Sequence, residues 1–192
     1  MGYDYLHVDI HLLPYFLLAL LLISEVSDVC DGYLARKYNQ VTDLGKILDP
    51  MVDSIYRISV FLAFTLPPVE LPVVLVLILL YRDWLVNILR TVCALKGWAL
   101  AARTSGKLKA IIQAAAAFAV VLLMIPYSSG YLAQEDLYTI SLTILSGAAL
   151  YTVLSGFDYV YANKNQIKLI LSEAEARDSL LDQIQSHSAS ER

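Results

Sequence analysis

LLPYFLLALLLISEVSDVCDGYLAR, residues 12–36, is an almost unbroken apolar run that ends in charged residues. A helix needs about 20 mostly apolar residues to cross the hydrocarbon core of a bilayer. This stretch is long enough to do so, and its charged end would then lie near the membrane surface. We therefore predict a membrane-spanning helix whose final turns carry Asp28 and Asp31.

The rest of the chain repeats this apolar pattern. Of its 192 residues, 58% are hydrophobic and 17% are charged, whereas soluble domains average about 45–50% and about 25%. Pro67-Pro68 and Pro126 are expected to end two of the helices. The sequence predicts an all-α, multi-span helical membrane protein with five transmembrane helices, at about Leu12–Arg36, Leu44–Leu66, Leu71–Leu95, Leu108–Ile125 and Leu137–Tyr161.

The basic residues predict the orientation in the membrane. Segments 1–11, 67–70 and 127–136 contain no Lys or Arg. The turns after the first and third spans and the segment after the fifth are basic, with Arg36, Lys37, Lys46, Lys96, Arg103, Lys107, Lys109, Lys164 and Lys168. Because cytoplasmic loops are enriched in Lys and Arg, the basic side is expected to face the cytoplasm. This divides the chain into an extracytoplasmic segment (1–11), a transmembrane domain (12–163) and a cytoplasmic polar tail (164–192).

Acidic residues recur at helical spacing on the first two spans. Asp28 and Asp31 are three residues apart, so a helix places them on one face. Gly45, Asp49 and Asp53 are each four apart and form one stripe on the next helix. The turn between the two spans is short, which makes them antiparallel neighbours. We expect the two acidic faces to meet near the cytoplasmic interface.

Four facing carboxylates at the edge of a membrane require a counter-charge. Each charged group at bilayer depth costs about 2.5–3.5 kcal/mol on the mildest scale, and like charges repel. Carboxylate oxygens suit hard divalent cations, so we predict one or two Mg²⁺ or Mn²⁺ ions here. Small residues beside the acids leave room for a ligand, and Arg36 can form a fork to a phosphate. The alternatives are acids that reach water separately, glycines that only pack helices, and an arginine that only anchors the helix.

Together these residues read D-x2-D-G-x2-A-R-x8-G-x3-D-x3-D, which resembles the signature of the CDP-alcohol phosphotransferase (CDP-alcohol phosphatidyltransferase) family. The resemblance implies that Asp28, Asp31 and Asp49 are metal ligands. It also implies that Asp53 is both a ligand and the catalytic base. The residues expected to hold the CDP part are Asp31, Gly32, Ala35, Arg36 and Gly45.

Three later stretches, 82–90, 106–113 and 155–159, resemble the branch of this family that uses glycerol 3-phosphate as acceptor. The implied reaction transfers a phosphatidyl group from CDP-diacylglycerol to glycerol 3-phosphate in phospholipid biosynthesis and releases CMP. Its implied setting is the bacterial cell membrane, with the active site on the cytoplasmic side. The expected ligands of the acceptor phosphate are Arg90, Lys107 and Lys109. No nucleic acid partner is expected, and a homodimer is implied only by the resemblance.

The neighbouring charges Arg82 and Asp83 lie within the third span, and helical geometry predicts that they point in different directions. Arg82 is expected to pair with another acid or to bind substrate, and the sequence does not decide which. Asp158 is expected to have a structural use, either pairing with a basic residue or capping the site.

The chain departs from the family pattern in several places. The family has six spans and only five are visible here, which indicates a truncated chain or a late start. Ser54 stands where a lysine often follows the last aspartate, and Arg57, one turn on, is expected to supply that charge. Thr91 and Ala110 replace an acid and a hydroxyl residue.

Three other interpretations remain open at this stage. The same chemistry could use another acceptor, namely inositol phosphate, serine or phosphatidylglycerol. A truncated, inactive paralogue would keep the motif without turnover. A carboxylate-based transporter would place its acids near the bilayer centre and show two similar halves, whereas here the acids cluster at one interface.

Overall fold

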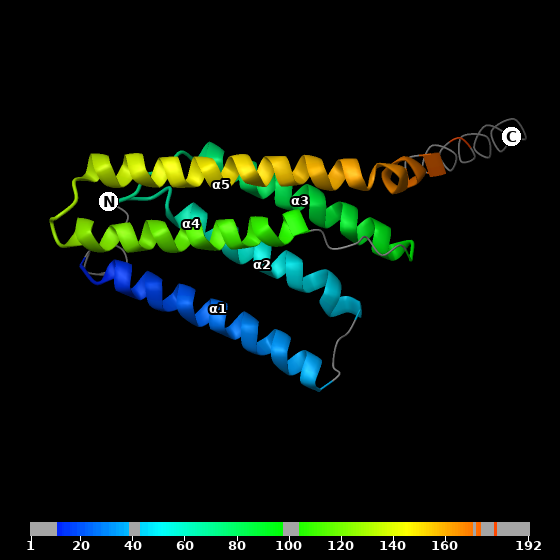
Figure 1. Ribbon diagram of the computed structural model, residues 1–192, viewed down its shortest axis with the longest axis horizontal. Coiled ribbons are helices and arrows are strands. Elements are labelled where there is room, and N and C mark those ends of the chain that lie inside the picture. The colour runs from blue at the N-terminus through cyan, green and yellow to red at the C-terminus, as the bar shows by residue number, and fades with distance from the viewer. Residues whose placement is uncertain (1–10, 39–42, 98–103, 171, 174–178, 180–192) are drawn as a thin grey trace, which may run out of the picture.

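The computed structural model describes residues 11–38, 43–97, 104–170, 172–173 and 179 (Figure 1). Within these ranges the side chains at 28, 29, 31–36, 43, 44, 46–48 and 50 are not described. The helices are α1 (Leu13–Lys37), α2 (Asp43–Ala63), α3 (Val73–Leu95), α4 (Thr104–Ser128) and α5 (Gln134–Ala162). The chain is helical again over 164–170. The predicted all-α class is confirmed.

The helices form one bundle in which segments distant in sequence lie together. The helix α5 packs along both α4 and α3, while α2 packs against α3 and α4. The first helix, α1, packs against α4. Figure 1 shows α1 and α2 running in opposite directions, as predicted, and the α4–α5 connection at the end of the bundle where α1 begins.

Two predicted helix ends were wrong, because α2 ends at Ala63, before the predicted Leu66, and α4 runs past its predicted end. The helix α4 does not stop at Pro126 but continues through it to Ser128. Proline removes a single N–H donor, and here it falls in the last turn, where the loss is small. The helix ends at Ser128, and Gly130 follows in the turn with a left-handed φ of 79°. Tyr131 N–H donates to Pro126 O at 2.9 Å and Gly130 N–H to Tyr127 O at 3.0 Å, which closes the final turn.

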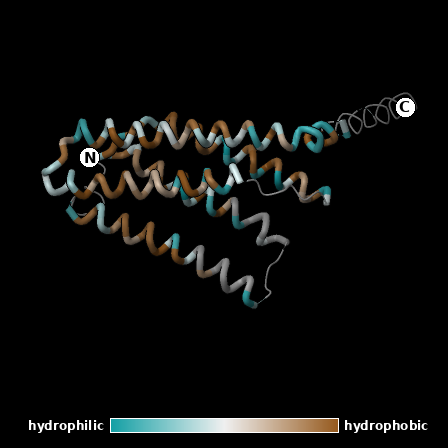
Figure 2. Tube along the Cα trace, viewed as in Figure 1, coloured by the Kyte–Doolittle hydropathy of each residue, from teal (hydrophilic) through white to brown (hydrophobic). Residues whose placement is uncertain are grey.

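In the part of the chain that the structure describes, two helices are long and apolar enough to cross a membrane, Thr104–Ser128 and Gln134–Ala162. A shorter apolar stretch, Leu13–Ser27, lies in α1 among the described residues. Large apolar side chains of α1 point outward, with Phe16 57% and Ile23 66% exposed. Figure 2 shows this hydrophobic run along the first half of α1. Exposed apolar surface of this kind suits lipid better than water.

The interior of the bundle has two different halves along its length. Near the α4–α5 connection, buried apolar residues pack into one cluster. We call this cluster the apolar half; its fully buried members include Phe61, Leu71, Leu79, Val120, Val121, Leu137 and Leu145. Towards the other end of the same helices the buried residues become polar, with Asp83, Lys109, Gln113, Thr152 and Ser155. The candidate site lies in this polar half.

Candidate functional site

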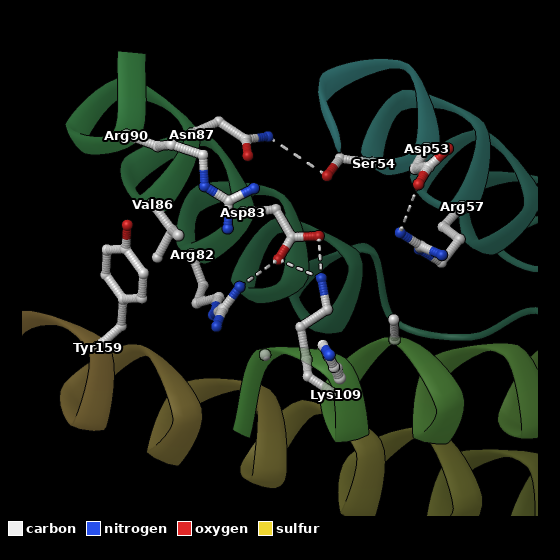
Figure 3. Close-up of a pocket in the computed structure, with 13 residues that line it drawn as sticks. Asp53, Ser54, Arg57, Arg82, Asp83, Val86, Asn87, Arg90, Lys109 and Tyr159 are labelled. Carbon is white, nitrogen blue, oxygen red and sulfur yellow. Dashed lines mark hydrogen bonds and ion pairs between the residues drawn. The ribbon is translucent and has the colours of Figure 1, made fainter. Parts of the chain in front are cut away.

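The polar half encloses a pocket of about 260 Å³ (Figure 3). Residues of α2, α3, α4 and α5 line it, so four helices contribute to one cavity. The lining residues are Asp53, Ser54, Arg57, Arg82, Asp83, Val86, Asn87, Arg90, Gly106, Lys107, Lys109, Ala110 and Tyr159. Five of these side chains are basic and two are acidic, which leaves an excess of three positive charges.

The carboxylate of Asp83 forms the centre of the pocket floor. Only 2% of this residue is exposed. The ammonium of Lys109, from α4, donates to both carboxylate oxygens of Asp83 at 2.8 and 2.7 Å. A buried ion pair needs such direct hydrogen bonds because both charges have left water. The pair joins α3 to α4 across the pocket floor.

The guanidinium of Arg82 forms a second side of this floor. Its Nη1 donates to Asp83 Oδ1 at 3.2 Å and its Nη2 to Ser155 Oγ at 2.9 Å. The prediction that Arg82 and Asp83 point in different directions was therefore wrong. The arginine side chain is long enough to fold back onto its neighbour, so Cβ directions alone do not decide the contact.

A glycine of α5 makes room for this arginine. A Cβ built on Gly156 would lie 3.0 Å from Arg82 Cγ and 3.5 Å from Arg82 Nε. The first of these distances is too short for ordinary van der Waals contact. Gly156 therefore allows the Arg82 side chain to lie flat against α5 between Asp83 and Ser155.

The α2 wall of the pocket carries Asp53. Its carboxylate lies 4.0 Å from Arg57 Nη2, and the Asp53 side chain is 42% exposed. Asn87 of α3 donates to Ser54 Oγ at 3.3 Å, which ties α3 to the residue following Asp53. Asp53 is thus half open to the pocket, with a cation one helical turn away.

An apolar cavity adjoins the polar one. It measures about 510 Å³, lies between α2 and α3, and is lined largely by apolar residues such as Met51, Ile55 and Trp84. The two cavities share Ser54, Asp83 and Asn87. A molecule with a charged head and an apolar tail could therefore occupy both.

Comparison with known proteins identifies the family of the chain. The model of the family described as CDP-alcohol phosphatidyltransferase matches residues 10–154, which is most of the chain. The chain belongs to this family. Its members are membrane-embedded enzymes, and the chain is therefore a CDP-alcohol phosphatidyltransferase embedded in a membrane.

Individual relatives share most of the chain. One is a CDP-diacylglycerol–glycerol-3-phosphate 3-phosphatidyltransferase of Bacillus subtilis, 34% identical over 152 residues, covering 78% of this chain and 74% of the relative. The enzyme of the same name from Rickettsia bellii is 32% identical over 145 residues, covering 76% and 77%. A probable phosphatidylglycerophosphate synthase of Mycobacterium tuberculosis is 30% identical over 135 residues, covering 70% and 59%.

The predicted metal and CDP residues lie on the two helices expected for this family. Gly45, Asp49 and Asp53 are on α2, where Asp49 is exposed. The α1 members lie within its last three turns, but their side chains are outside the described residues: Asp28, Asp31, Gly32, Ala35 and Arg36. Among the side chains that the structure does describe, no three of His, Cys, Asp or Glu form a metal-binding group. The proposed ligand set therefore stays a prediction.

The three residues predicted for the acceptor phosphate come together. Arg90, Lys107 and Lys109 all line the pocket, on the same cavity as Asp53. They differ in setting, because Lys107 is exposed whereas Lys109 is buried against Asp83. A Cβ added to Gly106 would meet nothing within 4 Å, so the backbone there is open to a ligand.

Sequence reasoning missed three pocket residues, Asp83 as the partner of Lys109, Asn87 and Tyr159. A signal for the first existed, since an acid within an apolar span needs a cation and the next helix carries Lys107 and Lys109. Asp158, left undecided, accepts a hydrogen bond from Ser105 Oγ at 2.6 Å. That bond joins α5 to the first turn of α4, a structural use in which the hydrogen-bond partner is a serine.

Proposed function

We propose that the chain transfers a phosphatidyl group from CDP-diacylglycerol to glycerol 3-phosphate, giving phosphatidylglycerophosphate and CMP. The observation that carries this proposal is the pocket itself. It combines a half-exposed carboxylate, Asp53, with an excess of three positive charges. An anionic acceptor with a free hydroxyl needs this combination, since the cations hold its phosphate and the carboxylate receives its proton. The relatives from Bacillus subtilis and Rickettsia bellii carry the name of this reaction.

The chain's acids suit the divalent cation on which the family depends. Asp49 and Asp53 present carboxylate oxygens four residues apart on α2, the donors that Mg²⁺ and Mn²⁺ prefer. Together with Asp28 and Asp31 of α1 they would hold one or two ions. Such ions neutralise charge on a pyrophosphate and on its leaving group. Asp31, Gly32, Ala35, Arg36 and Gly45 would hold the CDP part beside them.

The chain's own residues then account for the acceptor side of the reaction. The Asp53 carboxylate takes the proton of the acceptor hydroxyl. The hydroxyl oxygen forms a bond to the phosphorus nearest the lipid, and the bond from that phosphorus to the CMP oxygen breaks. Arg57, 4.0 Å from Asp53, places a positive charge beside this carboxylate.

The acceptor phosphate lies against Arg90, Lys107 and Lys109 in this proposal. Lys109 contributes from the pocket floor, where its bonds to Asp83 hold it in place. Arg90 and the exposed Lys107 approach from α3 and from the first turn of α4. The adjoining apolar cavity of about 510 Å³ suits an acyl chain of the donor lipid.

The membrane setting extends the proposal. All five helices would cross the bilayer within a domain of residues 12–163, with 1–11 outside the cell and the tail 164–192 in the cytoplasm. The helices α2 and α3 carry more charged residues than a simple apolar span. Among these charges, five line the site: Asp53, Arg57, Arg82, Asp83 and Arg90. They face the pocket rather than lipid, as intramembrane charges usually do. The site would then open to the cytoplasm, and two copies would form a homodimer.

Release of CMP by the purified chain tests this function. The protein is incubated in detergent micelles with CDP-diacylglycerol, Mg²⁺ and one acceptor at a time: glycerol 3-phosphate, inositol phosphate, serine or phosphatidylglycerol. We expect CMP and phosphatidylglycerophosphate in equal amounts with glycerol 3-phosphate. Faster release with another acceptor would reassign the substrate, and no release with any acceptor from well-folded protein would indicate an inactive paralogue.

A further inference from the structure

Two buried polar groups on the α5 side of the pocket have no use in the reaction described so far. The hydroxyl of Tyr159 and the Nε of Arg82 are both inaccessible to water and, among the described residues, have no hydrogen-bond partner. Tyr159 as a whole is only 3% exposed. A buried donor left without a partner costs roughly 1–3 kcal/mol, so such a pair is expected where a ligand supplies the missing acceptor.

Both groups belong to the pocket wall. Arg82 and Tyr159 line the same cavity as Arg90 and Asp53. Tyr159 follows Ser155 by four residues and so lies one turn further along the same face of α5. Figure 3 shows the tyrosine ring rising from α5, with its hydroxyl pointing to the side of the pocket where Arg90 lies.

The neighbouring guanidinium of Arg90 does not remove the need for an acceptor. It lies near enough to Tyr159 to act on the phenol as a charge and as a hydrogen-bond donor, although no hydrogen bond between them has a normal distance and angle. A guanidinium can only donate. Even a closer approach of Arg90 would therefore leave the proton of the Tyr159 hydroxyl without an acceptor.

The Arg82 side chain is held so that it cannot turn elsewhere for a partner. Asp83 and Ser155 bind its two terminal nitrogens at 3.2 and 2.9 Å. The missing side chain of Gly156 provides the space in which its Cγ and Nε lie. The remaining donor, Nε, is buried beside α5 and has no hydrogen-bond partner among the described residues.

We propose that the Tyr159 hydroxyl and Arg82 Nε, both positioned by the 155–159 turn of α5, are specificity-determining donors to the phosphate of the acceptor. A phosphate offers several acceptor oxygens and can satisfy both donors at once. An acceptor without a phosphate, such as serine, would leave two buried donors unsatisfied. The inference rests on the proposed use of glycerol 3-phosphate and adds residues to that same pocket.

The first test compares Tyr159→Phe with Tyr161→Phe, a matched change on the same helix. Tyr161 is 71% exposed and lies outside the pocket lining. Binding of glycerol 3-phosphate to the full chain with Mg²⁺, without donor lipid, is measured by calorimetry. We expect Tyr159→Phe to weaken binding roughly ten-fold, as loss of a hydrogen bond to a charged group does. Tyr161→Phe should bind like the wild type.

The second test displaces Arg82 without removing it. Gly156→Ala places a methyl group 3.0 Å from Arg82 Cγ, so the arginine must shift by a few tenths of an ångström, whereas Gly147→Ala adds the same methyl group on the same helix with nothing within 4 Å. We expect Gly156→Ala to raise the KM for glycerol 3-phosphate several-fold, with the KM for CDP-diacylglycerol unchanged. Gly147→Ala should change neither constant.

The outcomes separate this inference from the proposed function. Equal affinity of the wild type and Tyr159→Phe for glycerol 3-phosphate overturns the inference, even when CMP release proceeds normally. Absence of glycerol 3-phosphate binding to the wild type overturns it as well. Weaker binding by Tyr159→Phe alone, together with no CMP release by the wild type, supports the donor pair and rejects the phosphatidyl transfer.

Discussion

The two halves of the bundle use the same helices for opposite purposes. In the apolar half, α3 and α5 bury Leu79 and Leu145, side chains that fill space and carry no charge. In the polar half, further along the same helices, they bury Asp83 and Ser155 instead. Burial of apolar surface stabilises the fold directly, whereas a buried ion pair contributes little net stability compared with apolar residues of the same size. The comparison indicates that the polar half is retained for its chemistry.

The largest effect is expected at Asp53. Replacing it by Asn removes the base while preserving the side-chain shape, and general bases contribute roughly 10²–10⁴ in rate. We expect kcat for CMP release to fall by that factor, with thermal unfolding in detergent unchanged. Asp136→Asn is the matched control, since Asp136 is exposed in the first turn of α5, at the apolar end. Full activity of Asp53→Asn would remove Asp53 from the base role.

The next effect concerns the buried pair of the polar half. Asp83→Ala leaves Lys109 and Arg82 as buried cations without their acid, and breaking a buried pair typically costs about 3–5 kcal/mol. We expect a large loss of stability, measured by thermal unfolding. The double variant Asp83→Leu with Lys109→Met should regain much of the stability but no transferase activity. Recovery of activity as well would show that the pair is not part of the site.

A core substitution in the apolar half should separate stability from function. Leu145→Ala creates a cavity at a fully buried position, and such changes cost about 2–5 kcal/mol. The protein that remains folded should keep its KM for glycerol 3-phosphate, because the acceptor pocket is formed by other residues. A raised KM in Leu145→Ala would contradict the division of the bundle into two halves.

The smallest effect is expected for a charged pair outside both halves. Lys96 binds Glu173, and the two side chains are 31% and 52% exposed. Exposed ion pairs contribute about 0–1 kcal/mol. Lys96→Ala should therefore leave both the unfolding temperature and CMP release close to wild type. The contrast with Asp83→Ala measures how much burial changes the consequence of losing an ion pair.

The sequence predicted the helices better than it predicted their ends. Apolar runs predicted a helix at each of the five places where the described residues form one, and two of these helices are long and apolar enough to cross a membrane. The end of α4 was missed because a proline in the last turn costs only one hydrogen bond, while Gly130, four residues on, supplies the left-handed residue of the turn that follows the helix.

The candidate site was predictable only in part, namely for basic residues that lie at the same side of the membrane. The grouping of Arg90, Lys107 and Lys109 followed from basic residues gathered at one side of the membrane. The bonds from Lys109 to Asp83 and from Arg82 to Ser155 span 26 and 73 positions. Both bonds depend on the position of α3 along its axis relative to α4 and α5. Hydrophobic periodicity predicts which face of a helix is buried but not this axial position. The buried hydroxyl of Tyr159 depends on the same axial position.

The central claim is that the acidic faces of α1 and α2 hold the divalent cation needed for transfer. Titration of the purified full chain with Mn²⁺, followed by electron paramagnetic resonance, tests it directly. We predict one or two Mn²⁺ ions bound per wild-type chain and binding weakened at least ten-fold in Asp49→Asn. Equal Mn²⁺ binding by the wild type and Asp49→Asn, or no binding by either, would contradict the account.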